Sequence, residues 1–596
     1  MKQTIRHFLG ALHFVWLSSK YWTITKLILL IIQSILPLAS LYLLKLVVDE
    51  VTNSIQAATT PDFAPVLWLI ALWGGVNLIT VFAATVNQYV NENQSLLVSN
   101  YMADIVHEKS AALELAYYEN PKYLNTLHRA QLESKSRPNQ ILNSLTSLIQ
   151  NGISLVAIGG LLIYLHWGAA VLLILAALPA LVVRLKFSEK RYVWARKRTQ
   201  LKRESNYLGY LLTFAEYAKE VRLFRLGTYF KNKFSVIQKQ LFKESKQIAF
   251  NQAWISLIAK GSEVIAIFAA YIFIAYRTVG GELTIGDLVM YYQAFQRGQA
   301  FLQSALTSLS SLYENKLFLQ NLFEFLDLKP AYTSKGSLPV PDLTKHSIRF
   351  DEVAFSYTPE GKKVLHEIQL EAKNNEVISL VGKNGAGKTT LIKLLCRLYE
   401  PTAGAIWIGD TNIQDIEVGA LRKQVSVIFQ DFIQYRRTAK ENIALGDVAH
   451  EVDMERLKEA ARLTGAAEII EKLPKQYDSM LGRLFTKGEE LSIGQWQKVA
   501  LARAFYSKAK IIVLDEPTSA MDALAEYEFF KKLKAIAQDK IIFLISHRLS
   551  SATMSDRIYF IEDGRIAESG SHEELIQLNG KYAFLFNKQA QLYRES

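Results

Sequence analysis

The stretch Gly382-Lys383-Asn384-Gly385-Ala386-Gly387-Lys388-Thr389 decides how the second half of this chain folds. It matches the phosphate-binding loop pattern Gly-x-x-x-x-Gly-Lys-Ser/Thr. The β-branched run 377–381 before it predicts a buried strand, and residues 390–398 after it have helical spacing without a breaker. Strand, glycine-rich turn and helix would aim backbone N–H groups and a helix N-terminus at one point, which suits a polyphosphate. The sequence therefore predicts nucleotide binding in an α/β domain.

The composition divides the chain into two halves of different character. The chain has 596 residues, which favours several domains, and 50% of them are hydrophobic. Long apolar runs crowd the first 320 residues, whereas the remainder has the mixed pattern of a soluble α/β protein. A single cysteine, Cys396, excludes an internal disulfide framework and a thiol-based metal cluster.

Six apolar runs predict membrane-spanning helices within residues 1–320. Each run meets or approaches the length of about 20 apolar residues that a bilayer requires. The last run is the weakest, because glutamines and Arg297 interrupt it. The expected spans are 24–48, 65–90, 141–165, 168–187, 251–276 and 285–312. A linker at 321–345 and a nucleotide-binding domain at 346–596 would follow, so the expected fold is an α-helical membrane domain joined to an α/β P-loop domain.

Basic residues predict the orientation of these spans. Nine lysines and arginines lie within residues 184–203, whereas the short connections on the other side of the membrane are nearly free of them. The positive-inside rule then places the N-terminus, the long loops 92–140 and 188–250, and the C-terminal domain in the cytoplasm. The net charge of +12 fits anionic lipid headgroups and requires no nucleic acid. We expect a multi-pass protein of a cell membrane, the inner membrane of a bacterium.

Turn signals interrupt both long loops, at residues 117–123 and 219–230. Such aromatic-rich elbows are candidates for docking onto the nucleotide-binding domain, and the aromatic segment 431–435 is suited to receive one. Within the spans, Lys260 and Glu263 are three residues apart on one helix. They are either a pair that neutralises itself or contacts for a transported substrate.

Two further strand patterns end in polar residues. Residues 511–514 lead into Asp515 and Glu516, and residues 541–545 lead into Ser546 and His547. An aspartate at the carboxyl end of a strand beside a phosphate loop supplies a Mg²⁺ site in nucleotidases. The next carboxylate, Glu516, is placed to polarise a water for attack on the γ-phosphate, and His547 is placed to hydrogen-bond that phosphate.

The stretch Leu491-Ser492-Ile493-Gly494-Gln495 completes an ordered set of motifs. With it, the C-terminal 250 residues resemble the nucleotide-binding domain of ABC transporters. Together with six preceding spans, nearly the whole chain resembles an exporter-type half-transporter. This resemblance implies ATP and Mg²⁺ as ligands and ATP hydrolysis coupled to transport.

The resemblance also implies roles for individual residues. Tyr357 would stack on adenine, Glu516 would be the catalytic base, and His547 and Gln430 would complete the catalytic set. Mg²⁺ would be held by Thr389, Gln430 and, through water, Asp515. The residues that would contact ATP are Tyr357, Gly382, Lys383, Asn384, Gly385, Ala386, Gly387, Lys388, Thr389, Thr390, Ser492, Gly494, Gln495 and Asp522.

The signature stretch implies a second subunit, because Ser492 and Gly494 would contact the γ-phosphate of ATP bound to the opposite chain. Ile493 stands where the family usually has glycine, and we expect its side chain to point away from the nucleotide. One chain carries one copy of each motif. A dimer is therefore expected; a homodimer is the simplest arrangement, and pairing with a different chain is the alternative.

The expected function is ATP-driven export by alternating access. Residues 429–443 are similar to those of exporters of modified peptides, which makes a peptide the first candidate substrate. A flippase for lipids or lipid-linked glycans, or a pump for hydrophobic drugs, fits the apolar spans as alternatives. An ATP-gated channel or channel regulator is a further alternative from a different class.

Overall fold

The chain divides into two compact units in its computed structural model. Met1–Ala112 and Pro121–Lys329 form one, called here the helical unit, and Leu113–Asn120 and Pro330–Ser596 form the other, the α/β unit. The structure describes residues 2–56, 63–120, 123, 126–127, 130, 137–328, 336–358, 361–518, 521 and 523–594.

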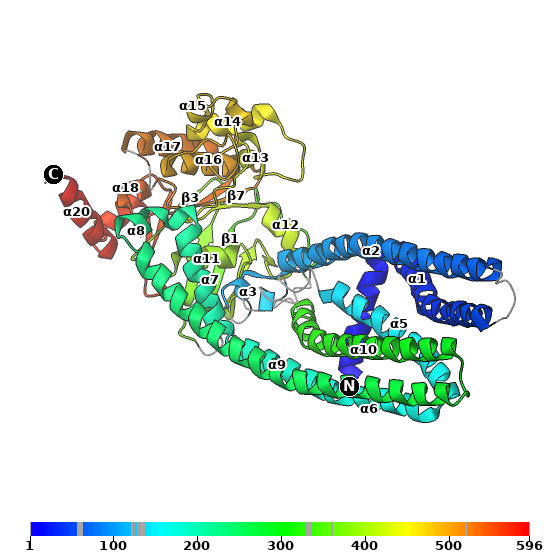
Figure 1. The fold of residues 1–596 in the computed structure, drawn as a ribbon. Coiled ribbons are helices and arrows are strands. Elements are labelled where there is room, and N and C mark those ends of the chain that lie inside the picture. The colour runs from blue at the N-terminus through cyan, green and yellow to red at the C-terminus, as the bar shows by residue number, and fades with distance from the viewer. Residues whose placement is uncertain are drawn as a thin grey trace. The chain divides into compact units, whose positions relative to one another are not determined.

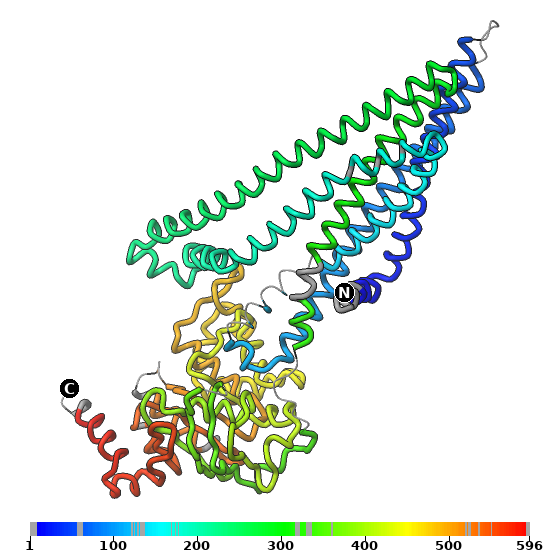
Figure 2. The backbone as a smooth tube through the Cα atoms, turned by 90° about the horizontal axis from the view of Figure 1, so that it is seen from below, coloured from blue at the N-terminus to red at the C-terminus, as the bar shows by residue number. Residues whose placement is uncertain are grey.

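The helical unit consists of long helices (Figure 1). Its described helices are α1 (Lys2–Gln56), α2 (Ala64–Ala112), α5 (Arg137–Leu165), α6 (Trp167–Lys197), α7 (Thr199–Thr213), the 3-10 helix η1 (Ala215–Tyr217), α8 (Ala218–Leu223), α9 (Gly227–Val279) and α10 (Ile285–Leu326). Figure 2 follows α6 and α9 side by side, with α7 continuing beside α9 beyond the end of α6.

Apolar side chains cover the outside of this unit. Ile28, Val81 and Phe82 are all more than half exposed, which suits hydrocarbon rather than water. Five of the described helices (α1, α2, α5, α6 and α9) are long and apolar enough to cross a membrane. Helix α10 carries the glutamines noted above and does not reach this level of apolarity. The count of six spans stays a prediction.

Polar and charged groups join the helices from within. Gln94 on α2 is fully buried and donates to the Thr23 hydroxyl of α1 at 2.9 Å. Lys45 of α1 pairs with Asp287 of α10 at 2.7 Å. Asp287 also closes a capping box with Thr284 at the start of α10. These contacts span helices far apart in sequence, and they satisfy groups that lipid could not.

The α/β unit is built on two sheets. Its strands are β1 (Ile348–Phe355), β2 (Leu365–Ala372), β3 (Val377–Val381), β4 (Ala403–Ile408), β5 (Thr411–Asn412), β6 (Val425–Ile428), β7 (Ile511–Asp515), β8 (Ile541–Ile545), β9 (Arg557–Glu562) and β10 (Arg565–Gly570). One sheet has the order β2-β1-β4-β5 and is antiparallel. The other has the order β10-β9-β3-β8-β7-β6, and only its edge strand β10 runs antiparallel.

Helices cover this second sheet, whose central strands are buried on both faces. The described helices of the unit are α3 (Leu115–Tyr118), α11 (Lys388–Leu395), α12 (Val418–Lys423), α13 (Ala439–Ala444), α14 (Met454–Thr464), α15 (Ala467–Ile470), the 3-10 helix η2 (Gln476–Asp478), α16 (Ile493–Tyr506), α17 (Ala523–Ile536), α18 (Leu549–Ala552), α19 (His572–Gln577) and α20 (Lys581–Arg594).

Side chains alternate between the two faces, as the pleat requires. Ile511 and Val513 pack with α11 and the antiparallel sheet, whereas Ile512 and Leu514 pack against α16 and α17. The carboxyl ends of β3, β7 and β8 consequently meet at one edge, where the loops carry the predicted site.

Candidate nucleotide-binding site

The phosphate loop runs from the end of β3 to the start of α11. Gly382 has φ +152°, and a Cβ there would lie 2.0 Å from the carbonyl oxygen of Ile561, so no side chain fits. Gly387 has φ +104° and is the N-cap of α11. These two glycines let the backbone turn sharply from strand to helix, which leaves the N-terminus of α11 directed at the loop's interior.

Lys388 is the first residue of α11, and only 5% of its surface is exposed. Its Nζ donates to the carbonyl oxygens of Gly382 at 2.7 Å and Lys383 at 2.9 Å, so the ammonium group is held inside the loop. Burial lowers the pKa of Lys388, while the nearby Asp515 and Glu516 act to raise it. A polyphosphate in the loop would supply the negative charge that this buried cation lacks.

A cavity of 360 Å³ joins the loop to the ends of β7 and β8. Ten of the residues predicted from the sequence line it: Asn384, Gly385, Gly387, Lys388, Thr389, Thr390, Gln430, Asp515, Glu516 and His547. Gly382, Lys383 and Ala386 belong to the same loop but are not among the lining residues. The cavity wall thus brings together predicted residues that are up to 163 positions apart in the sequence.

Oxygen atoms suited to Mg²⁺ converge on this cavity. The Thr389 hydroxyl donates to Asp515 Oδ2 at 3.2 Å, and the amide of Gln430 lines the same wall. Burial raises the pKa of Asp515 to about 6, and a bound cation would favour the ionised carboxylate. Among the described residues there is no group of three or more His, Cys, Asp or Glu that would hold a metal alone. Mg²⁺ binds through one or two protein groups and the phosphates of its substrate, and Thr389 and Asp515 are groups of the kind it binds.

Glu516 sits at the centre of a hydrogen-bonded group. Its carboxylate accepts from Gln430 Nε2 at 2.9 Å and lies 2.9 Å from His547 Nε2. Burial, and then the charge of Lys388, lower the pKa of His547. The backbone of Glu516 has φ +49°, an unfavourable value for a residue with a side chain, and this kind of strain gathers at functional sites.

Gln497 holds this strained backbone, and the sequence analysis missed it. It lies on α16, is buried, and donates from Nε2 to the carbonyl oxygen of Glu516 at 3.0 Å. On the other side, the N–H of Glu516 donates to the carbonyl of Ile545 at 2.9 Å. The only sequence signal for Gln497 is its place two residues after the signature stretch.

Tyr357 is 42% exposed and is fixed by three neighbours, of which the sequence analysis named only Thr390. Its hydroxyl lies 3.0 Å from that of Thr390, and the ammonium of Lys393 lies 5.4 Å from the ring centroid. Tyr399 packs edge-on against the same ring at 5.2 Å. Lys393 pairs with Glu119 at 2.7 Å, and Tyr399 also donates to that carboxylate.

Glu119 follows helix α3, whose eight-residue segment Leu113–Asn120 belongs to the α/β unit although it lies about 210 residues earlier in the chain. Leu115 and Ala116 pack against the same buried cluster that contains Leu391 of α11. Hydrogen bonds from Lys393 and Tyr399 hold the pKa of Glu119 below its ordinary value, although burial acts in the opposite direction.

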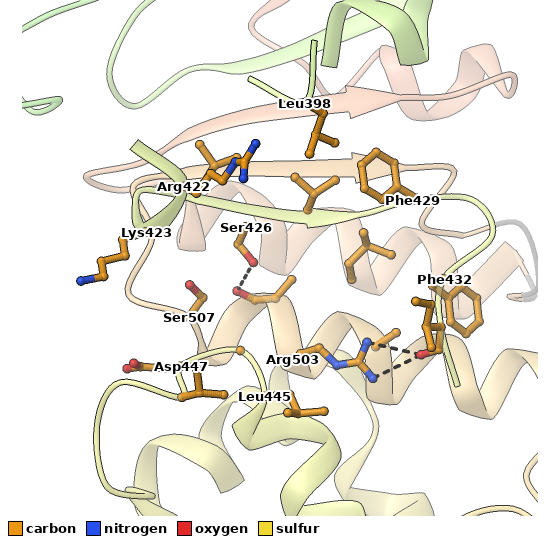
Figure 3. A pocket seen from close by; sticks show the side chains of 18 of the residues that line it. Leu398, Arg422, Lys423, Ser426, Phe429, Phe432, Leu445, Asp447, Arg503 and Ser507 are labelled. Atoms are coloured by element: carbon orange, nitrogen blue, oxygen red, sulfur yellow. Dashed lines mark hydrogen bonds between the residues drawn. The ribbon is translucent and has the colours of Figure 1, made fainter. Parts of the chain in front are cut away.

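A larger cavity of 1180 Å³ lies beside α3 in the same unit. Figure 3 shows Phe429 and Phe432 on one part of its wall and Arg503 of α16 directed toward the carbonyl oxygen of Ile433. Leu115 and Glu119 also line it. Four residues of the predicted aromatic edge are among its lining residues: Asp431, Phe432, Ile433 and Tyr435.

The signature stretch lies elsewhere in the chain's own fold. Ser492 is the N-cap of α16 and forms a capping box with Gln495. Ile493 is 69% exposed. Neither Ser492, Gly494 nor Gln495 lines the 360 Å³ cavity. Asp522, the remaining predicted contact, lies outside the described residues.

Comparisons with known proteins identify the same kind of protein as the sequence motifs do, over nearly the whole chain. Residues 365–519 match the profile of the family described as ABC transporter. The chain is 32% identical over 550 residues to the subtilin transport ATP-binding protein SpaT of Bacillus subtilis, covering 92% of this chain and 88% of that protein. It is 29% identical over 587 residues to the nisin transport ATP-binding protein NisT of Lactococcus lactis subsp. lactis, covering 97% and 95%.

A solved structure shows the same fold. A bacterial Atm1-family ABC exporter with ATP bound aligns with a TM-score of 0.78 over 98% of both chains, at 24% sequence identity. A multi-pass helical unit fused to an ATP-binding P-loop unit defines a membrane exporter driven by ATP. The chain belongs to the ABC transporter family, as an exporter-type half-transporter with one nucleotide-binding domain. The predicted family, fold class and ATP-driven export are confirmed.

Proposed function

We propose that this half-transporter exports a peptide, and specifically a modified one. The observation that carries the proposal is the similarity to the proteins named for subtilin and nisin transport, which extends over at least 88% of each relative. It covers the helical unit as well as the ATP-binding unit, and the substrate path of an exporter lies in its membrane helices. The similarity of residues 429–443 to peptide exporters supports the same substrate class.

The proposed catalytic unit is a dimer of two identical chains. The residues of one chain supply the phosphate loop, the base and the histidine, whereas Ser492 and Gly494 lie outside that cavity. A second copy would bring its own signature stretch over the bound nucleotide. Each ATP would then be enclosed by two subunits, and ATP binding would draw the two α/β units together.

The chain's own groups suit in-line hydrolysis. Lys388 is placed to neutralise the β- and γ-phosphates, and Tyr357 to stack on adenine. Glu516 would accept the proton of the attacking water, while Gln430 and His547 hold its carboxylate in place. Thr389, Gln430 and Asp515 would hold Mg²⁺, which when bound neutralises charge on the phosphates. We therefore propose that the protein is an ABC-type translocase, an ATPase that couples hydrolysis to the movement of a substrate across the membrane.

Movement would reach the membrane through the two elbows. The segment Leu113–Asn120 already packs in the α/β unit, and the 1180 Å³ cavity beside it is of a size and aromatic character to receive α8 of the second copy. The helical unit would alternate between inward- and outward-open states. We place the N-terminus and the α/β unit in the cytoplasm and the helices in the inner membrane of a bacterium, because the basic residues gather on that side.

Substrate-stimulated ATP hydrolysis in proteoliposomes tests this function. The panel holds subtilin, nisin, an unmodified peptide precursor, lipid A, a lipid-linked glycan and hydrophobic drugs. We expect the modified peptides to raise the hydrolysis rate more than the unmodified precursor does, the lipids and drugs to have no effect, and ATP to drive uphill uptake of the modified peptides into inverted vesicles. Stimulation by lipids or drugs only would replace the peptide assignment. Single-channel currents on ATP addition without uphill transport would indicate a channel.

A further inference from the structure

A polar cavity of 650 Å³ lies within the helical unit, between α5, α6, α9 and α10. Alanine, serine, threonine and glutamine form most of its wall, together with Arg184, Lys260 and Glu263. None of the described residues that line it is aromatic or a large aliphatic residue. A wall of this kind offers hydrogen bonds to a polar ligand, in a unit whose outer surface is apolar.

Glu263 is the unsatisfied group in this cavity. It lies on α9, one of the helices long and apolar enough to cross a membrane, and is only 3% exposed. Gln303 of α10 donates to its Oε2, but Oε1 has no hydrogen-bond partner. A buried carboxylate oxygen without a donor is costly, and ionisable groups at membrane depth mark functional sites.

Neither of the two cations that line this cavity contacts the Glu263 carboxylate directly. Among the described residues, neither Lys260 nor Arg184 forms an ion pair with it, although both line the same cavity. Arg184 instead donates to the Thr307 hydroxyl of α10. The sequence allowed two interpretations of Lys260 and Glu263, a pair that neutralises itself or contacts for a substrate. The structure does not contain the ion pair.

Two serines of the wall already have hydrogen-bond partners. Ser308 donates to the carbonyl oxygen of Ser304, and the Ser304 hydroxyl accepts from Asn151. Glu263 lines the cavity, and its buried Oε1 is an acceptor without a hydrogen-bond donor. An ammonium or guanidinium group would supply both the missing hydrogen bond and the opposite charge.

We propose that this cavity binds a basic side chain of the exported peptide, with the Glu263 carboxylate accepting from its ammonium or guanidinium group. The inference rests on the proposed peptide export and narrows the substrate to peptides that carry lysine or arginine. Arg184 and Lys260 offer donors to carbonyl oxygens of the same ligand. The lining by small side chains leaves room for an extended basic residue.

The test measures binding of two probes to the full chain in phosphatidylcholine nanodiscs without nucleotide. One probe is dansylated tetra-arginine amide; the other carries citrulline, a neutral isostere, in place of each arginine. We expect the wild type to bind the arginine probe about tenfold more tightly than the citrulline probe. In the Glu263→Gln variant this preference should disappear, whereas Glu263→Asp, which keeps the charge, should retain part of it.

A matched control is Asp287→Asn, which removes a carboxylate of the same unit that is already paired with Lys45. It should leave the preference for arginine unchanged. Equal binding of both probes by the wild type overturns the inference without involving any variant, as does a Glu263→Gln chain that keeps the preference. If peptides still stimulate ATP hydrolysis in that case, peptide export stands and only the role of Glu263 is lost. Stimulation by lipids or drugs alone removes the peptide assignment itself.

Discussion

At the scale of single residues, the candidate site depends on how Glu516 is held. Its carboxylate has two side-chain partners, Gln430 and His547, and its strained backbone is fixed by Gln497 and Ile545. The strain is located at the residue that is proposed to point a carboxylate at the attacking water. The site therefore needs contacts to the backbone of Glu516 as much as contacts to its side chain.

Replacing Glu516 by glutamine should separate binding from turnover. The amide keeps the shape of the side chain but cannot accept a proton, so ATP should still bind while steady-state hydrolysis falls by a factor of about 10² to 10⁴. Phosphate release and nucleotide binding by the purified protein measure the two quantities. The exposed Glu528→Gln variant of α17 is the matched control and should hydrolyse ATP normally. Appreciable turnover by Glu516→Gln would reject this residue as the base.

Replacing Gln497 by leucine tests the backbone contact. The change removes the donor at 3.0 Å from the Glu516 carbonyl and leaves a buried acceptor unsatisfied. We expect kcat to fall about tenfold with little change in the KM for ATP, because the catalytic carboxylate moves while the phosphate loop does not. The exposed Gln538→Leu variant serves as the control. An unchanged kcat would show that Gln497 does not position Glu516.

At the scale of elements, α3 is joined to the proposed adenine site. Glu119 contacts both Lys393 and Tyr399, and these two side chains pack against the ring of Tyr357. These four side chains thus connect the segment Leu113–Asn120 to the place where adenine is proposed to stack. By thermodynamic reciprocity, a coupling between them would have the same size in both directions: docking of the segment would favour base stacking by the factor by which stacking favours docking.

The Glu119→Gln variant tests this link. It removes an ion pair at 2.7 Å, so basal hydrolysis should stay within about twofold while stimulation by substrate falls several-fold. Because the pKa of Glu119 is lowered from 4.5, the pair contributes above that pH and is lost as the pH falls through the lowered value. Assays at pH 7.5 therefore report the intact pair. Glu108→Gln on the exposed side of α2 is the control, and equal loss of stimulation in both would contradict a specific role.

The elements also show which parts of the site a sequence can predict. Asp515, Glu516 and His547 could be placed beside the phosphate loop because their strands run parallel and end at one edge of the sheet. Gln497, Lys393 and the Lys45–Asp287 pair could not, because they depend on how helices rotate and pack. The functional residues in the loops can be predicted because they depend on the local sequence pattern and on the order of the strands. Contacts between helices leave no such pattern in the local sequence.

At the scale of the whole molecule, the two parts of the proposed composite site do not meet within one chain. The phosphate loop and Glu516 line one cavity, and the signature stretch at the start of α16 lies outside it. In the proposed dimer, a second chain would complete each site. The proposed homodimer would contain two equivalent nucleotide sites.

Mixing two inactive chains tests this arrangement. Lys388→Ala disables the phosphate loop and Ser492→Arg blocks the signature, so each homodimer should be inactive. A heterodimer purified through two different tags keeps one intact site and should recover a substantial part of the wild-type hydrolysis per site. The measurement is the ATPase activity of the two homodimers and of the heterodimer, each without transport substrate. If each chain formed its own complete site, the mixture would stay inactive.

The segment Leu113–Asn120 has a consequence for how the protein is made. It is translated directly after α2, yet the buried cluster against which Leu115 packs includes strand residues as late as Ile561. At about 5–20 residues per second, the ribosome delivers the last of these on the order of tens of seconds later. During that interval the cluster is incomplete, so Leu115 and Ala116 reach their full packing only after the last strands of the sheet have been translated.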